Sequence, residues 1–228
     1  MTMASANIVL DETDLRIPAS ALTLDGFRDW AVSDEFPERG RISFVQGEVC
    51  VDLSPEEIKS HNFTKADLFG WLWAFVQNED LGRFFADRAL LVNEAADLAI
   101  EPDIMFCLWN SLESGRVELR EVQVGSGRWM EVVGSPDLVV EIISRSSVTK
   151  DTRKLRKAYH GAEIPEYWLI DARGELLQFT VLTWDTKGYV EAACDEQDWK
   201  TSTILNRRVK LSRHTDRVGN WKYKLHIQ

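Results

Sequence analysis

The chain has 228 residues, of which 44% are hydrophobic and 28% are charged, as is ordinary for a globular protein. Its net charge of −10 argues against a broad basic face for nucleic acid, and no apolar run approaches the roughly 18 residues of a membrane span. The first ten residues lack the basic flank and apolar core of a signal peptide, so we expect a cytoplasmic protein.

Apolar periodicity and turn residues predict helices and strands in alternation along the chain. After a loose lead-in over residues 1–20, the expected helices cover residues 24–32, 54–78 and 150–160. The expected strands cover residues 41–45, 48–53, 83–92, 103–108, 137–144, 166–171 and 175–182, with a hairpin around 125–127 and short strands over 187–228.

Local signals support several of these elements. Gln46-Gly47 suits a two-residue hairpin turn, and Ser54, Pro55 and Glu57 together resemble the capped start of a helix. The strand–helix–strand unit from 137 to 171 predicts a crossover between two parallel strands. The sequence therefore predicts an α/β fold with a mixed sheet.

The three cysteines, Cys50, Cys107 and Cys194, are widely spaced, and no Cys-x-x-Cys pair exists. A disulfide framework or a zinc site is therefore not expected, and buried free thiols are the default.

Positive charge is concentrated in two stretches of an otherwise acidic chain. Residues 206–228 hold seven Lys and Arg against Asp216 alone, a local charge of +6, so the other residues together carry −16. A second basic cluster covers residues 145–157. Each cluster has two interpretations, a solvated face or the lining of a phosphate-binding groove.

The most informative stretch is the expected strand 137–144, because it places Glu141 inside an apolar run. Side chains alternate along a strand, so Asp137, Val139 and Glu141 share one face. A buried carboxylate is costly unless it is paired or holds a cation. A metal site and a structural hydrogen-bond or ion-pair partner remain equal alternatives for Glu141.

Three further acidic residues could converge on Glu141. Glu48 opens a hairpin strand, Asp103 opens the strand after Pro102, and Asp151 begins the following helix. Neighbouring strands lie about 4.8 Å apart, so Asp103 and Glu141 could share one hard divalent cation. The alternatives are a turn residue at Asp103, an exposed hairpin residue at Glu48 and a helix-dipole partner at Asp151.

Basic residues on the same helix could assist. Lys150, Lys154 and Lys157 form one stripe at helical spacing and could reach a phosphate or the attacking water, although a solvated stripe is the more common outcome. His61 stands alone on its helix, which favours a structural role over a catalytic one.

The motifs resemble a known family. They run in order as Gln46-Gly47-Glu48, His61, Glu101-Pro102-Asp103, Pro136-Asp137-Leu-Val-Val-Glu141-Ile-Ile-Ser144, Asp151 with Tyr159, and Ile164-Pro165-Glu166-Tyr-Trp-Leu-Ile-Asp171. The pattern is similar to the Uma-type putative restriction endonuclease family of the PD-(D/E)XK nuclease superfamily, over about residues 22–182. The resemblance implies a restriction endonuclease-like core, an α+β fold with a mixed four-stranded sheet flanked by helices.

The resemblance also implies the chemistry. Mg²⁺-dependent (or Mn²⁺-dependent) cleavage of DNA would use Asp103 and Glu141 as metal ligands with Glu48 assisting. We therefore divide the chain into a lead-in (1–20), a nuclease domain (21–182) and a basic β-rich extension (183–228) packed on the same domain. A homodimer is an expectation by analogy with palindrome-cutting nucleases.

Three positions depart from the family pattern. Ile143 occupies the superfamily's lysine position, and Leu155 occupies the position on the following helix where the family commonly has its lysine. Ser43 replaces a glutamate before the hairpin turn. Lys154 and Lys150 are the alternative lysines, and the acidic pair is retained.

These observations leave three functional hypotheses. The first is a metal-dependent DNA endonuclease in which Lys154 or Lys150 orients the nucleophile and the basic helix and tail contact phosphates. The second, favoured by Ile143 and Leu155, is a non-catalytic nucleic-acid-binding or regulatory protein on the same scaffold. The third, favoured by the net charge, is an interaction protein with no nucleic-acid role.

Overall fold

The computed structural model describes residues 7–10 and 15–228. Four α-helices and three short helical turns are present in this part: α1 (Leu24–Ala31), α2 (Phe63–Asn78), α3 (Trp109–Glu113), α4 (Arg156–Gly161), the 3₁₀ turn η1 (Ala19–Leu22), and the π-helical turns η2 (Ile58–Asn62) and η3 (Lys150–Leu155). None of these helices is long and apolar enough to cross a lipid bilayer.

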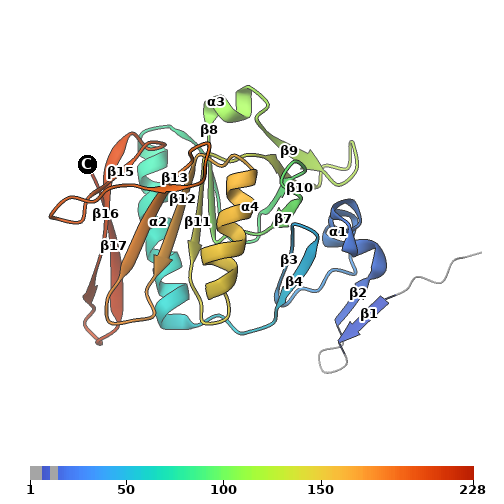
Figure 1. The fold of residues 1–228 in the computed structure, drawn as a ribbon, viewed down its shortest axis with the longest axis horizontal. Coiled ribbons are helices and arrows are strands. Elements are labelled where there is room, and N and C mark those ends of the chain that lie inside the picture. Colours follow the sequence, from blue (N-terminus) through green and yellow to red (C-terminus); the bar gives the residue numbers. More distant parts are fainter. Residues whose placement is uncertain (1–6, 11–14) are drawn as a thin grey trace, which may run out of the picture.

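A six-stranded mixed sheet forms the centre of the molecule, in the order β14-β13-β12-β11-β8-β5 (Figure 1). Its strands are β5 (Gly82–Phe85), β8 (Ile104–Leu108), β11 (Leu138–Ile142), β12 (Glu166–Asp171), β13 (Gln178–Thr183) and β14 (Val190–Glu191). β11 pairs with β12 in parallel and with β8 antiparallel. The predicted parallel pair around the crossover helix is therefore confirmed.

Two hydrophobic cores cover the two faces of this sheet. Val139 on β11 packs with Leu155 and Tyr159 of η3 and α4, whereas Val140 on the same strand packs with Leu68 of α2. The alternation predicted for strand 137–144 is thus the one that divides the cores. As a result, α4 and α2 lie on opposite faces of the sheet (Figure 1).

A second six-stranded sheet has the order β4-β3-β7-β6-β10-β9. Its strands are β3 (Arg41–Val45), β4 (Glu48–Asp52), β6 (Leu90–Asn93), β7 (Leu98–Ile100), β9 (Val117–Glu121) and β10 (Trp129–Gly134). Phe27 and Trp30 of α1 are buried against this sheet with Phe44. The β3–β4 hairpin turns at Gln46 and Gly47, both with positive φ, as the sequence predicted.

The C-terminal strands form a small antiparallel sheet, β15 (Lys200–Ser202), β16 (Arg207–Thr215) and β17 (Trp221–Ile227). Val209, Leu211 and Leu225 are buried in the core that also contains α2. The fully buried Glu166 accepts hydrogen bonds from Ser202 Oγ (2.6 Å) and from the backbone N–H of Thr203 (2.8 Å). These contacts attach the tail to the central sheet.

The sequence prediction was right about the α+β class, but the central sheet has six strands instead of four, because β5 and β14 extend it. The strand expected over 83–92 is two strands in different sheets, separated by Arg88, whose φ is 68°. Strand β7 was not anticipated. The lead-in expected over 1–20 falls partly outside the described residues; within them β1 (Asn7–Leu10) pairs with β2 (Leu15–Pro18).

Two smaller expectations were also wrong. The long helix begins at Ile58 and not at Ser54, because the Glu57 carboxylate accepts the Ser60 N–H as its cap. The three cysteines are free, as expected, but only Cys107 is buried, whereas Cys194 is exposed.

Candidate metal-binding active site

The antiparallel pairing of β8 and β11 brings the two key carboxylates together. The paired register ends with Val140 opposite Ile104. Glu141 and Asp103 are the next residues, so they are neighbours at this end of the two strands. Asp103 Oδ2 accepts the backbone N–H of Ile142 at 2.8 Å. The exposed fractions of Asp103 and Glu141 are only 1% and 3%. The proximity that the sequence suggested is therefore present.

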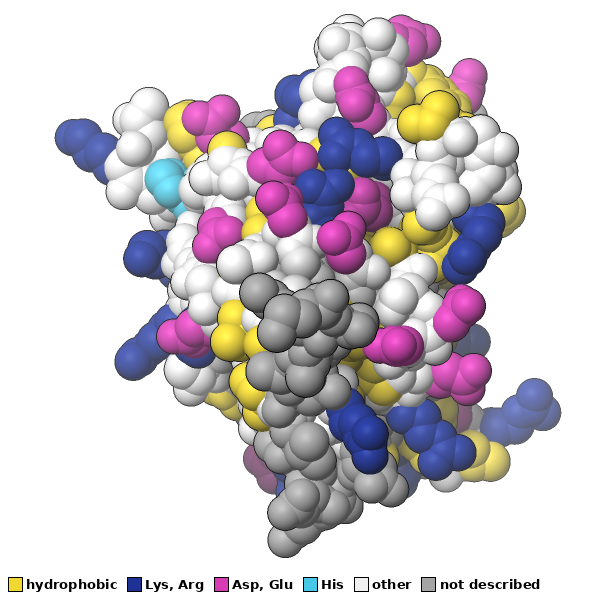
Figure 2. All heavy atoms as spheres, turned by 90° about the vertical axis from the view of Figure 1, so that its right-hand side faces the viewer, with side chains coloured by type: hydrophobic (Ala, Val, Ile, Leu, Met, Phe, Trp, Pro, Cys, Tyr) yellow, Lys and Arg dark blue, Asp and Glu magenta, His cyan; other side chains and the backbone are white. Residues whose placement is uncertain are grey.

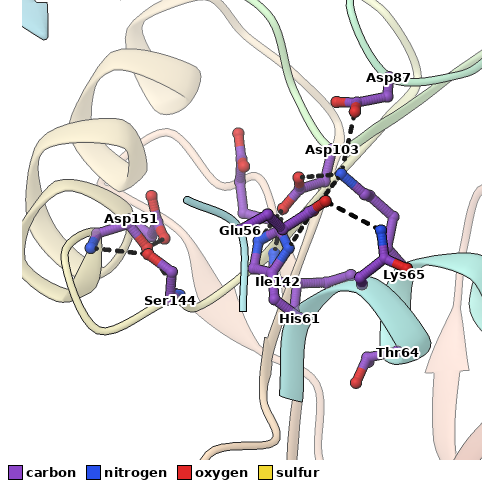
Figure 3. A network of polar contacts seen from close by, with 12 residues as sticks. Glu56, His61, Thr64, Lys65, Asp87, Asp103, Ile142, Ser144 and Asp151 are labelled. Carbon is purple, nitrogen blue, oxygen red and sulfur yellow. Dashed lines mark hydrogen bonds and ion pairs between the residues drawn. The ribbon is translucent and has the colours of Figure 1, made fainter. Parts of the chain in front are cut away.

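Three basic side chains surround Asp103, and two of them, His61 and Lys65, are labelled in Figure 3. Arg41 Nη1 lies 2.8 Å and Lys65 Nζ 3.7 Å from Oδ1, and His61 Nε2 lies 3.3 Å from Oδ2. Burial alone would raise the pKa of Asp103, but the hydrogen bond and charge of His61, together with Arg41 and Lys65, hold it well below the usual range. Asp103 is consequently an anion at any working pH.

Glu141 has the opposite electrostatic environment. Burial, followed by the charges of Asp103 and Asp151, raises its pKa to about 8. Its Oε1 accepts the hydroxyl of the buried Tyr159 at 2.5 Å. The pKa values of these two neighbouring carboxylates shift in opposite directions, because Arg41, His61 and Lys65 lie within ion-pair distance of Asp103 whereas the charge of Lys150 only partly offsets the burial of Glu141.

Asp151, in the first turn of η3, is the third buried carboxylate. Burial raises its pKa to about 6, with a further contribution from Asp103. Ser147 Oγ donates to its Oδ2, whereas Oδ1 is buried and has no hydrogen-bond partner among the described residues. Lys150 Nζ is 3.8 Å from this oxygen, at the limit of an ion pair. An unpaired buried carboxylate oxygen calls for a ligand or an explanation.

A hollow in the surface gives access to all three carboxylates. It is lined by Asp103, Glu141 and Asp151 together with Arg41, His61 and Lys150. A wider hollow beside it runs along β4 and shares Arg41 and Lys150 as lining residues. The two hollows are therefore neighbours on the same surface of the molecule.

The predicted residues divide into two groups. Asp103, Glu141, Asp151, His61 and Lys150 share the inner hollow. Glu48 and Lys154 line only the wider one, where they form an ion pair with each other, with side chains 63% and 46% exposed.

The structure adds a residue that the sequence did not single out. Glu56, just before η2, accepts from His61 Nδ1 at 2.6 Å and from Lys65 Nζ at 2.6 Å. Glu56, His61 and Asp103 each place a ligand atom within 4.8 Å of the others. The sequence signal was weak, because Glu56 stands in what resembled the first turn of an ordinary helix.

His61 lies between the carboxylates of Glu56 and Asp103, with Nδ1 facing Glu56 and Nε2 facing Asp103. Burial would lower the pKa of His61, but Asp103 and Glu56 outweigh burial and raise it. Both nitrogens face carboxylate oxygens, which accept only, so this position favours the doubly protonated ring over a metal-ligating one. A ring in this position keeps Asp103 charged and correctly oriented.

The donor set of the inner hollow fits a hard divalent cation. Asp103, Glu141 and Asp151 supply oxygen atoms only, which is the preference of Mg²⁺ and, among transition metals, of Mn²⁺. The unpartnered Asp151 Oδ1 and the crowding that raises the pKa of Glu141 both indicate a place where positive charge would be stabilised.

Comparison with known proteins identifies the family. Residues 24–211 match the model of the Uma2 family, described as putative restriction endonucleases. The match covers most of the chain, so the protein belongs to this family and the resemblance found in its motifs is confirmed.

Solved structures support the fold. The crystal structure of a protein described as a putative nuclease belonging to DUF820 from Anabaena variabilis superposes with a TM-score of 0.57 at 18% identity, covering 81% of this chain and 90% of that one. At this identity the likeness shows a shared fold. The search of curated proteins found no match.

Proposed function

We propose that this protein is a divalent-metal-dependent endonuclease that hydrolyses DNA phosphodiester bonds. The observation that carries the proposal is the convergence of three buried carboxylates, Asp103, Glu141 and Asp151, in one accessible hollow of a nuclease-type fold. Mg²⁺ or Mn²⁺ is the metal that this oxygen donor set suits. Membership in a family described as putative restriction endonucleases supports DNA as the substrate class.

Each residue has a role that follows from its surroundings. Asp103 and Glu141 would hold the metal, with Asp151 Oδ1 as a further oxygen facing the same hollow. A bound divalent ion supplies an activated water and offsets the charge that builds up on the phosphate. Arg41, His61 and Lys65 keep Asp103 ionised and fix its two oxygens. Assistance by Glu48 stays a prediction, since its side chain pairs with Lys154 at the rim.

Of the two alternative lysines, Lys150 is better placed to orient the nucleophile. Its Nζ lies 3.8 Å from Asp151, and its charge lowers the pKa of Glu141, which is a direct electrostatic contact with the acidic cluster. Lys154 is held by Glu48 outside the inner hollow. A lysine beside the reacting phosphate can donate to the attacking water or stabilise the negative charge of the transition state at the five-coordinate phosphorus.

A cleavage assay tests the proposal. Supercoiled plasmid and a labelled duplex are incubated with the protein and Mg²⁺ or Mn²⁺, and the product is followed over time. We expect nicking or linearisation by the wild type, none with EDTA, and none by the Asp103→Ala, Glu141→Ala double variant. Equal activity of wild type and double variant would show that the nuclease signal is a contaminant.

A second candidate is a non-catalytic nucleic-acid-binding protein on the same scaffold. The observation that favours it is the burial of Ile143 and Leu155, because the two positions where the family places its lysine are occupied by core side chains. It predicts DNA binding without cleavage, with affinity unchanged by Asp103→Ala. A homodimer and a cytoplasmic location stay predictions; sedimentation equilibrium measures the first.

A further inference from the structure

The small C-terminal sheet has one buried face and one solvent face. Antiparallel pairing places Leu211 opposite Leu225, and both are buried against α2. The intervening side chains point to the other face because strand residues alternate. This outer tail face consists of Arg208, Lys210, Ser212, His214, Lys222, Lys224 and His226.

Most of the charge on the outer tail face lacks an acidic partner. Arg208 pairs with Asp195, and Lys210 Nζ donates to the carbonyl of Gln197 at 2.7 Å. Within residues 7–10 and 15–228, no carboxylate lies within ion-pair distance of Lys210, Lys222 or Lys224. In keeping with a positive local field, burial and the neighbouring Lys224 and Lys210 lower the pKa of His226.

Aromatic rings hold several of these cations in place. The Arg208 guanidinium lies 5.5 Å from the centre of the Trp199 ring, and Lys224 Nζ lies 5.6 Å from that of Trp71. The Trp71 indole N–H in turn donates to the carbonyl of Tyr223 on β17. Side chains ordered in this way lose less conformational entropy when they bind a partner.

The opposite, buried face of the small C-terminal sheet is attached near the end of the central sheet that carries the acidic site. Arg213 on β16 donates to the carbonyls of Gly174 and Glu175 in the loop after β12. From the same loop, Arg173 Nη1 lies 3.4 Å from the carbonyl of Ser144, which lines the inner hollow. Because β11 and β12 are parallel, both loops leave the sheet at the same edge.

The rest of the molecule has the opposite charge. Residues outside 206–228 carry −16 in total, and the side of the molecule around α1 shows acidic side chains interspersed with Lys and Arg (Figure 2). A polyanion that approaches three carboxylates is repelled unless cations elsewhere attract it. Each of the two strands places two cations, Arg208 and Lys210 on β16 and Lys222 and Lys224 on β17, about 6.8 Å apart along the strand, a spacing that suits neighbouring phosphates.

We propose that the outer tail face binds the phosphate backbone of DNA and supplies affinity that is independent of the metal. Its DNA partner rests on the proposed nuclease function. In this arrangement the duplex lies on the outer face of β16 and β17. Lys210, Lys222 and Lys224 make sequence-independent contacts, so affinity falls steeply with salt.

The test is fluorescence anisotropy with a labelled 30-base-pair duplex in EDTA, over a range of salt concentrations. The variant Lys210→Gln, Lys222→Gln, Lys224→Gln removes three charges from the face. The matched control, Arg16→Gln, Arg128→Gln, Lys187→Gln, removes three exposed charges elsewhere. Circular dichroism and melting temperature establish that both variants are folded.

We expect the face variant to bind DNA at least about tenfold more weakly at low salt. The slope of log K against log salt should become shallower by about 1 for each phosphate that the variant no longer neutralises. The control should bind within about twofold of the wild type. Equal weakening in both variants, or none in the face variant, would overturn the proposal. So would salt-dependent self-association through this face in place of DNA binding.

The result is separable from that of the nuclease proposal. Metal-free binding that is abolished in the face variant, without cleavage by the wild type, supports the face and refutes the nuclease. Cleavage by the wild type, with binding unaffected in the face variant, does the reverse.

Discussion

The strand β11 has a buried carboxylate at each end, and the two differ in almost everything except burial. Asp137, just before the strand, accepts the Leu108 N–H at 2.8 Å and the Ser111 hydroxyl at 3.0 Å and pairs with Arg116. Glu141, at the other end, has Tyr159 as its donor and two carboxylates as neighbours. Burial alone therefore does not identify a site, because a saturated carboxylate is structural and a crowded one is available to a cation.

The largest effect on cleavage should come from neutralising Glu141, the carboxylate that is crowded by two others. Glu141→Gln keeps the shape of the side chain and an oxygen for the Tyr159 hydroxyl, but it removes a negative charge that the metal needs. We expect cleavage to fall at least about a hundredfold, while the melting temperature stays the same or rises. Cleavage assays and calorimetry on the same preparation measure both. Unchanged cleavage would place the metal elsewhere.

The saturated end should respond in the opposite way. Asp137→Ala leaves the Leu108 N–H, the Ser111 hydroxyl and Arg116 without their acceptor, which should destabilise the fold by about 3 kcal/mol. Activity per folded molecule should remain near that of the wild type. Urea unfolding gives the stability. If this variant abolished cleavage while staying folded, the contrast between the two ends would fail.

The stability of the folded protein should depend on pH through the crowded carboxylates. In EDTA, Glu141 binds a proton in the folded state up to about pH 8 but only up to about 4.5 when unfolded, because burial raises its pKa. Its contribution to stability is therefore complete below pH 4.5 and is lost as pH rises to about 8. Asp151 adds the same trend up to about pH 6. Urea titrations at several pH values should show the decline, and Glu141→Gln should flatten it.

The affinity for the metal should rise with pH where the stability falls, because protons compete with the metal for Glu141. We expect the affinity for Mn²⁺ to rise with pH until about 8 and then level off. Isothermal titration at several pH values between the pKa of Asp151 and that of Glu141 measures this affinity. An affinity independent of pH in that range would mean that Glu141 is not a ligand.

The smallest contrast concerns the two lysines. Lys150→Met should reduce cleavage by about tenfold, because its ammonium lies beside Asp151. Lys154→Met should change it by less than about threefold, because its exposed pair with Glu48 contributes little. Single-turnover kinetics on a labelled duplex measures both. A larger effect of Lys154→Met would indicate that the nucleophile lies near Glu48 and Lys154, at the rim.

Part of this site could be predicted from sequence and part could not. The pairing of Asp103 with Glu141 was predictable, because an acid at the start of one strand and an acid within an apolar run meet when the strands are neighbours. Asp137 has the same local pattern as Glu141, and only its distant partners reveal its structural role. Arg41 on β3, Glu56 in the loop before η2 and Lys65 on α2 are separated in the sequence and resemble surface residues in isolation.

The lysine stripe illustrates a second limit. Lys150, Lys154 and Lys157 share one face only if the helix has ordinary spacing, but residues Lys150–Leu155 form a π-helical turn. The wider spacing changes the phase of the side chains, so Lys150 faces the acidic cluster and Lys154 faces β4.

The overall class was predictable from periodicity; the division of residues 83–92 between two sheets depended on Arg88, which the apolar pattern does not mark as a turn.

The central claim is that Asp103, Glu141 and Asp151 form a divalent-cation site, and a crystal soaked in Mn²⁺ tests it most directly. Anomalous scattering identifies the ion and its ligands without reference to activity. We predict one Mn²⁺ peak in the inner hollow, bound by oxygens of Asp103 and Glu141, with Lys150 closer to it than Lys154. A peak on Glu56 and His61 that excludes Glu141, or no peak at all at saturating Mn²⁺, would contradict the account.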